Sequence, residues 1–109
     1  MPDIVNQRVD EAQRELQLRA QRLERLVKRA KSKNMSPAFQ EGVHLVSDMI
    51  ENQSKLYDEM IFSVPKTALE QQRNLMLFTG KMNQTVKEGI KTTTDAIDTM
   101  IQSLESMVR

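Results

Sequence analysis

The spacing of the apolar residues constrains this chain most, since they recur every three or four positions over nearly its whole length. That spacing is the period of one face of an α-helix, whereas a half-buried strand alternates every second residue. The sequence also holds only three glycines and three prolines, too few for the frequent turns of a β-sandwich or barrel. The fold class is therefore predicted to be all-α, with residues 1–109 forming a single helical domain.

Local signals divide the pattern into helices. Ser36-Pro37 marks a helix start, because serine caps free backbone amides and proline suits the first helical position. Pro65 interrupts the pattern, and Thr67 with Glu70 forms a capping box that restarts it. The predicted helices span about 4–34, 36–63 and 67–108.

The third predicted helix is too long for the other two to cover. At 1.5 Å per residue it would measure roughly 63 Å, against roughly 46 Å and 40 Å for the first two. Either a partner covers the excess or the helix folds back at Gly80 or Gly89, and a fresh start at Thr92 is a further possible break. We therefore expect a helical hairpin or three-helix bundle with coiled-coil character, completed by oligomerisation.

The net charge of +1 conceals two unlike halves. Residues 1–34 hold nine basic and five acidic side chains, whereas residues 35–109 hold seven and ten. Such complementary halves favour antiparallel docking or self-association. Nucleic acid is a less favoured partner, because acidic residues interrupt the basic row and no aromatic side chain accompanies it to stack on a base. The candidate basic patch consists of Arg19, Arg22, Arg25 and Arg29.

The residues needed for catalysis are scarce. The chain has no cysteine, and His44 is its one histidine, so neither a cysteine–histidine pair nor a zinc-cysteine site can form within one chain. We predict no catalytic residues, no cofactor and no enzymatic activity. Glu41 and His44 have the Glu-x-x-His spacing of di-iron bundles, but a solvated polar face explains them better, so no metal site is predicted.

The location of the protein is expected to be cytoplasmic. No stretch approaches the 18–20 apolar residues of a membrane span, and an acidic residue stands near the start, where a secretory signal has basic ones.

We expect this chain to act by binding another helix, either of a client protein or of a second copy. Its eight methionines favour this role, because methionine adapts to irregular apolar partners. Such a module could be an adaptor, an assembly subunit or a small chaperone; the alternatives are an amphipathic coat protein on a lipid or storage-granule interface and a nucleic-acid-associated protein. The predicted partner-binding residues are Val43, Val46, Met49, Ile50, Tyr57, Met60, Met76, Met82, Val86, Ile90, Ile97, Met100, Ile101 and Leu104.

Overall fold

The computed structural model describes residues 4–31 and 35–108, which contain four helices and no strand. The all-α prediction is thereby confirmed. The last three positions of the first predicted helix, 32–34, lie outside the described residues. The helices are α1 (Ile4–Lys31), α2 (Pro37–Asp58), α3 (Ala68–Lys81) and α4 (Gln84–Met107).

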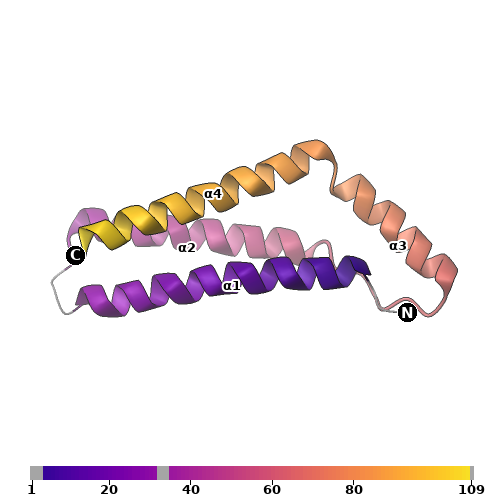
Figure 1. Ribbon diagram of the computed structural model, residues 1–109, viewed down its shortest axis with the longest axis horizontal. Helices are drawn as coiled ribbons and strands as arrows, with labels where there is room; N and C mark the ends of the chain where they lie inside the picture. Colours follow the sequence, from indigo (N-terminus) through magenta and orange to yellow (C-terminus); the bar gives the residue numbers. More distant parts are fainter. Residues whose placement is uncertain (1–3, 32–34, 109) are drawn as a thin grey trace.

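Three of these helices lie side by side along the long axis of the molecule. Figure 1 shows α2 running antiparallel to both α1 and α4, while α3 diverges from them at one end. The molecule is consequently elongated, with extents of 57 × 24 × 16 Å.

The predicted caps at the starts of α2 and α3 are confirmed. The Phe39 amide donates to Ser36 Oγ at 3.1 Å, with Pro37 in the first turn. The Glu70 amide donates to the Thr67 hydroxyl at 3.1 Å, and the Glu70 carboxylate accepts from the Lys66 amide at 2.8 Å. Each cap satisfies backbone donors that have no partner within the helix.

The second helix ends at Asp58, earlier than the predicted 63. Beyond it the chain turns so that Met60 becomes buried. The Asn6 side chain then holds the backbone of Phe62 from both sides, donating to its carbonyl at 2.7 Å and accepting from its amide at 3.0 Å. Tertiary contacts with α1 therefore end this helix before Pro65 is reached.

The segment predicted as a third helix over about 67–108, with breaks considered at Gly80, Gly89 and Thr92, forms two helices. The helix breaks at Met82 and Asn83, and the Asn83 side chain accepts from the Val86 amide at 3.0 Å as the N-cap of α4. The further break considered near Thr92 does not occur, because Gly89 and Thr92 both lie inside α4. A side-chain cap, rather than a weak helix former, therefore sets the break.

The core lies where α2 and α4 pack together against α1. Val46, Ile97 and Ile101 are the largest side chains that are fully buried among the described residues. Gly42 allows a close approach between α2 and α4, since a Cβ built there would lie 2.7 Å from Leu104 Cδ2. Nothing lies within 4 Å of a Cβ built at Gly89 in the described part of the chain.

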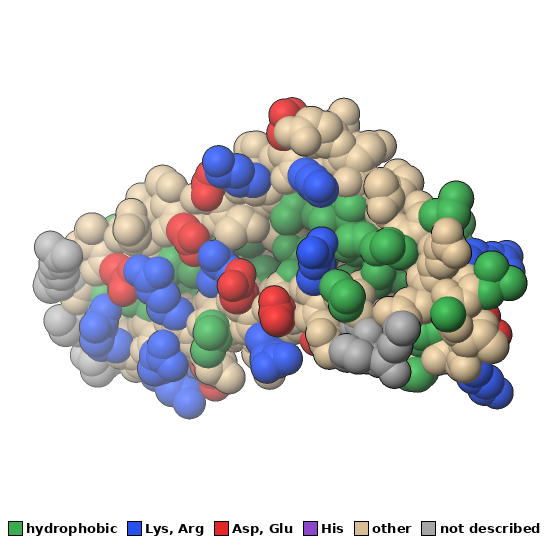
Figure 2. All heavy atoms as spheres, turned by 45° about the vertical axis from the view of Figure 1, so that its right-hand side comes forward, with side chains coloured by type: hydrophobic (Ala, Val, Ile, Leu, Met, Phe, Trp, Pro, Cys, Tyr) green, Lys and Arg blue, Asp and Glu red, His purple; other side chains and the backbone are tan. Residues whose placement is uncertain are grey.

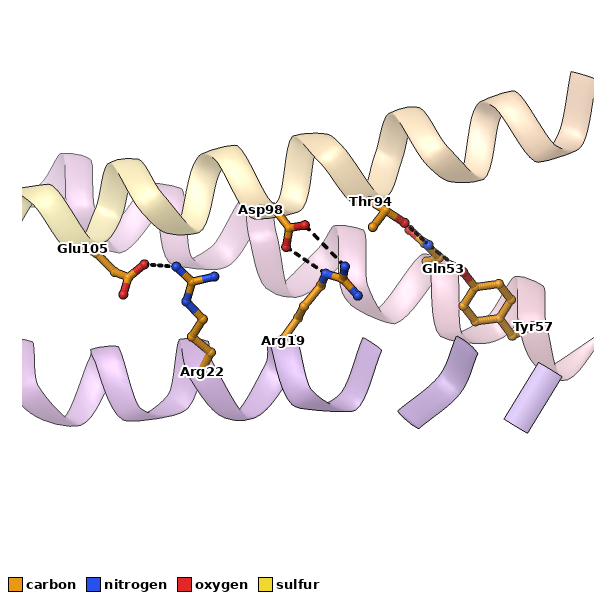
Figure 3. Close-up of polar contacts among 7 residues, drawn as sticks. All are labelled: Arg19, Arg22, Gln53, Tyr57, Thr94, Asp98 and Glu105. Carbon is orange, nitrogen blue, oxygen red and sulfur yellow. Dashed lines mark hydrogen bonds and ion pairs between the residues drawn. The ribbon is translucent and has the colours of Figure 1, made fainter. Parts of the chain in front are cut away.

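Ion pairs join the basic α1 to the acidic α4 (Figure 3). Arg19 Nε lies 2.8 Å from Asp98 Oδ1, and Arg22 pairs with Glu105 about one turn further along α1 and two turns further along α4. The hydrogen bond that Arg19 donates to Asp98 raises the pKa of Arg19 above its ordinary value, because it favours the charged guanidinium. At these positions, the opposite charges of the two halves of the sequence therefore pair with each other within one chain.

Gln53 connects α2 to α4 from inside the core. It is 5% exposed, and its Nε2 donates to the hydroxyls of Tyr57 and Thr94, each at 2.9 Å (Figure 3). Its Oε1 is buried without a hydrogen-bond partner among the described residues. Because a buried amide costs free energy unless it is hydrogen-bonded, the bond to Thr94, which crosses from α2 to α4, favours this one alignment of the two helices.

The glycines provide a test of this packing. We expect Gly42→Val to lower the free energy of unfolding by about 1–3 kcal/mol, because the new side chain displaces the buried Leu104. Gly89→Ala should raise that free energy by up to about 1 kcal/mol, because alanine is the better helix former. Urea denaturation at low protein concentration measures both, and an equal response of the two variants would contradict the packing described.

Candidate interaction surface

The short helix α3 is the least buried part of the structure. Within α3, all of whose residues are described, only Phe78 is buried. Three further contacts tie α3 to the chain before it: the Asn74 side chain donates to the Ser63 carbonyl at 3.4 Å, and Lys81 donates to the Glu59 carbonyl at 3.1 Å and stacks on the Phe62 ring. A helix of this length is marginal in water without tertiary packing.

The side of α3 opposite Phe78 is apolar and exposed. Leu69 and Met76 are 76% and 69% exposed, although they are among the largest apolar side chains of the helix. Helical geometry places Arg73 and Gly80 on this same side. These four residues, Leu69, Arg73, Met76 and Gly80, are called the outer face of α3.

A hollow lies between α3 and the long helices. Figure 2, in which this side of the molecule comes forward, shows hydrophobic side chains gathered in a hollow next to α3. It has a volume of about 220 Å³, and Phe78, Leu75 and Met82 line it from the α3 side. The inner side of α3 is thus partly occupied by contacts within the chain, whereas the outer face is not.

A larger groove runs between α2 and α4 on their outer side. Its volume is about 550 Å³, and its walls are mostly apolar. Gly89 forms part of its wall and has no side chain to fill the space in front of it. The α2/α4 groove is lined by Met49, Asn52, Gln53, Leu56, Val86, Gly89, Ile90 and Thr93.

A second groove, of about 500 Å³, lies between α1 and α2. Val27, Val43 and Ile50 contribute to its apolar lining. The ion pairs Glu24–Lys28 and Glu51–Lys55, each at 3.4 Å, lie within single helices and involve residues that line it. None of the residues that line this groove belongs to α3.

The predicted partner-binding residues divide into three groups. Six are buried in the chain's own core and so do not face a partner in this structure: Val46, Tyr57, Met60, Ile97, Ile101 and Leu104. Seven are partly buried: Val43, Met49, Ile50, Met82, Val86, Ile90 and Met100. Met76 alone among the fourteen is exposed. Met49, Val86 and Ile90 come together in the α2/α4 groove, while Val43 and Ile50 lie in the groove beside α1.

The basic patch is divided by the fold. Arg19 and Arg22 turn toward α4 and pair with its carboxylates, whereas Arg25 and Arg29 are exposed on α1. The four arginines therefore do not present one continuous row of available cations.

The Glu-x-x-His pair lies on the exposed side of α2. Glu41 and His44 are both exposed, and the described residues contain no group of three or more histidine, cysteine, aspartate or glutamate side chains placed to hold a metal ion. In the same part of the chain, none of the helices combines the length and apolarity needed to cross a bilayer.

Sequence reasoning missed the outer face of α3 because it treated residues 69–82 as one stripe. The apolar residues of this segment fall on opposite sides of the helix, with Phe78 and Met82 on one and Leu69 and Met76 on the other. Leu77, 47% exposed, was not recognised at all. Counting turns from Phe78 would have revealed the two faces.

In comparisons with protein family models, curated proteins and solved structures, no match to this chain was found.

The attachment of α3 through Phe78 can be tested by proteolysis. We expect Phe78→Ala to speed tryptic cleavage after Arg73 about tenfold or more, because the local opening of α3 loses its main opposing contact. The long helices should keep nearly their original melting temperature. Leu77→Ala, which shortens an exposed neighbour, is the matched control, and equal cleavage of the two variants would contradict this role of Phe78.

Proposed function

We propose that this protein is a protein-interaction module that binds an amphipathic helix of a partner through the outer face of α3 and the α2/α4 groove. The exposed outer face carries the proposal, since two large apolar side chains lie there beyond the reach of the chain's own core. Large exposed apolar patches typically mark interaction sites. In this view the helices form a bundle with coiled-coil character that a partner completes.

In the proposed function, α1, α2 and α4 form a stable scaffold and α3 contacts the partner. The core around Val46, Ile97 and Ile101 holds α1, α2 and α4 together. The helix α3 contributes little to that core, so its apolar residues contribute little to the stability of the free chain. Burial of Leu69 or Met76 by a partner would release about 1.5–3 kcal/mol for each fully covered side chain.

The binding mode would be that of an amphipathic helix in a groove. Residues spaced three, four and seven apart on the ligand helix would enter the α2/α4 groove, and α3 would cover the ligand from the side. Met49 in the groove and Met76 on α3 are unbranched side chains that adapt to the shape of a partner. An adaptor, an assembly subunit and a chaperone for helical clients all use this mode.

The test compares two substitutions of exposed apolar residues. Met76→Glu places a charge on the outer face of α3, whereas Leu18→Glu places one on α1, where Leu18 is 62% exposed. Both variants should keep the helix content of the unmodified chain. Affinity purification from the native host, followed by quantitative mass spectrometry, should show a loss of bound proteins of at least tenfold for Met76→Glu only.

Equal recovery of the same proteins by both variants would contradict the proposed function. Flotation with phospholipid vesicles gives a second readout. If the unmodified chain floats with vesicles and Met76→Glu does not, the outer face serves a lipid interface rather than a protein, and the proposal fails.

A further inference from the structure

We propose that the helix which fills the α2/α4 groove is α3 of a second copy of this chain, so that two copies exchange their α3 helices reciprocally. This inference rests on the proposed function and specifies its partner. Because every chain carries both the groove and the exposed helix, a two-fold axis would form both contacts at once.

The apolar residues of the two surfaces have the same spacing. Leu69 and Met76 on α3 are seven residues apart, which is about 10.5 Å along a helix. The groove walls repeat this interval on α2, with Met49 and Leu56, while Val86 and Ile90 add apolar side chains from α4. Equal intervals of seven allow the side chains of one helix to enter the spaces between those of the others.

Each surface carries a glycine that the fold of one chain does not require. A Cβ built at Gly80 or at Gly89 meets nothing within 4 Å among the described residues. Glycine inside a helix costs roughly 1 kcal/mol relative to alanine. Gly80 belongs to the outer face of α3 and Gly89 to the groove, so both leave room for the close approach of another helix.

The charges at the two surfaces are complementary. Arg73 lies on the outer face between Leu69 and Met76. The exposed acids Asp48 on α2 and Glu59, the C-cap residue just beyond α2, lie one turn from residues that line the groove, Asn52 and Leu56. An arriving α3 would thus bring a cation to a groove with acidic residues near both of its ends.

The exposed large hydrophobic side chains are concentrated in one stretch of the chain. Between Ile61 and Leu77, six of them are at least 46% exposed. Leu69 and Met76 of the outer face are among the most exposed of these, and they are the two that would enter the groove of the other copy. On α2, Leu45 is also exposed, and Leu56, 36% exposed, lies in the groove itself.

Disulfide trapping tests this arrangement directly, because the chain contains no cysteine of its own. Chains carrying Met76→Cys are mixed with chains carrying either Val86→Cys or Thr93→Cys and then oxidised. We expect one of the two mixtures to form the mixed disulfide at least tenfold faster than Met76→Cys mixed with Leu18→Cys. Which of the two reacts gives the direction of α3 in the groove.

If all three mixtures react equally slowly, or if Met76→Cys pairs mainly with itself, the exchange of α3 is overturned. A light-scattering mass of one chain at every concentration would overturn it as well. If trapping fails while Met76→Glu still removes proteins from the purification, the site binds a different protein and only this inference is lost. Failure of both experiments would remove the proposed function too.

Gly89→Ala separates a binding role from a structural one. This substitution should raise the melting temperature of the dilute chain, yet weaken self-association at least tenfold because the new methyl group enters the groove. Thr99→Ala is the matched control, since Thr99 is exposed on α4 and does not line the groove. A Gly89→Ala chain that associates as tightly as Thr99→Ala would contradict the inference.

Discussion

The packing of α4 into the angle between α1 and α2 determines the rest of this structure. Ile97 and Ile101 are fully buried there with Val46, and the absence of a side chain at Gly42 lets α4 approach α2 closely. Interiors packed at this density leave little room for alternative arrangements. Once α4 occupies that position, the three long helices bury their largest apolar side chains against one another, and α3 is left with only Phe78 buried.

The polar contacts between helices help to fix the position of α4 against α1 and α2. Arg19 and Arg22 meet carboxylates of α4, and Gln53 bridges two hydroxyls inside the core. Partly exposed ion pairs add little stability on their own. Their effect here is specificity, because a shift of α4 by one turn would separate both arginines from their partners and break the bond from Gln53 to Thr94.

The exposed helix α3 is the observation behind the proposed partner. An α3 that buries only Phe78 has most of its apolar surface in contact with water. The proposed interaction would follow from the same apolar burial that forms the core. It would differ in that the three long helices pack without it, so binding could be added or removed while they stay in place.

The sequence predicts much of the fold and less of the site. The spacing of apolar residues predicts α1 and α2 and the helical state of α4, and the caps at Ser36 and Thr67 are visible because each is a local pattern. The break at Asn83 escaped prediction, because Met82 continues the apolar period and a lone asparagine is a weak signal.

The position of α3 depends on tertiary contacts that no local pattern encodes. Phe78 determines which side of α3 turns inward, and only then does the opposite side become an exposed face. For the same reason, six residues expected to meet a partner, among them Met60, Ile97 and Leu104, are buried in the core that forms when α4 packs against α2.

Hydrogen exchange in α3, measured by mass spectrometry over a range of protein concentrations, tests the central claim most directly. If α3 is completed by a partner copy, its amides should exchange quickly in dilute solution and become at least tenfold slower as the concentration rises, while amides near Ile97 in α4 stay protected throughout. If α3 is as protected as the middle of α4 even in dilute solution, the helix is stable within one chain, and the claim that it needs a partner is contradicted.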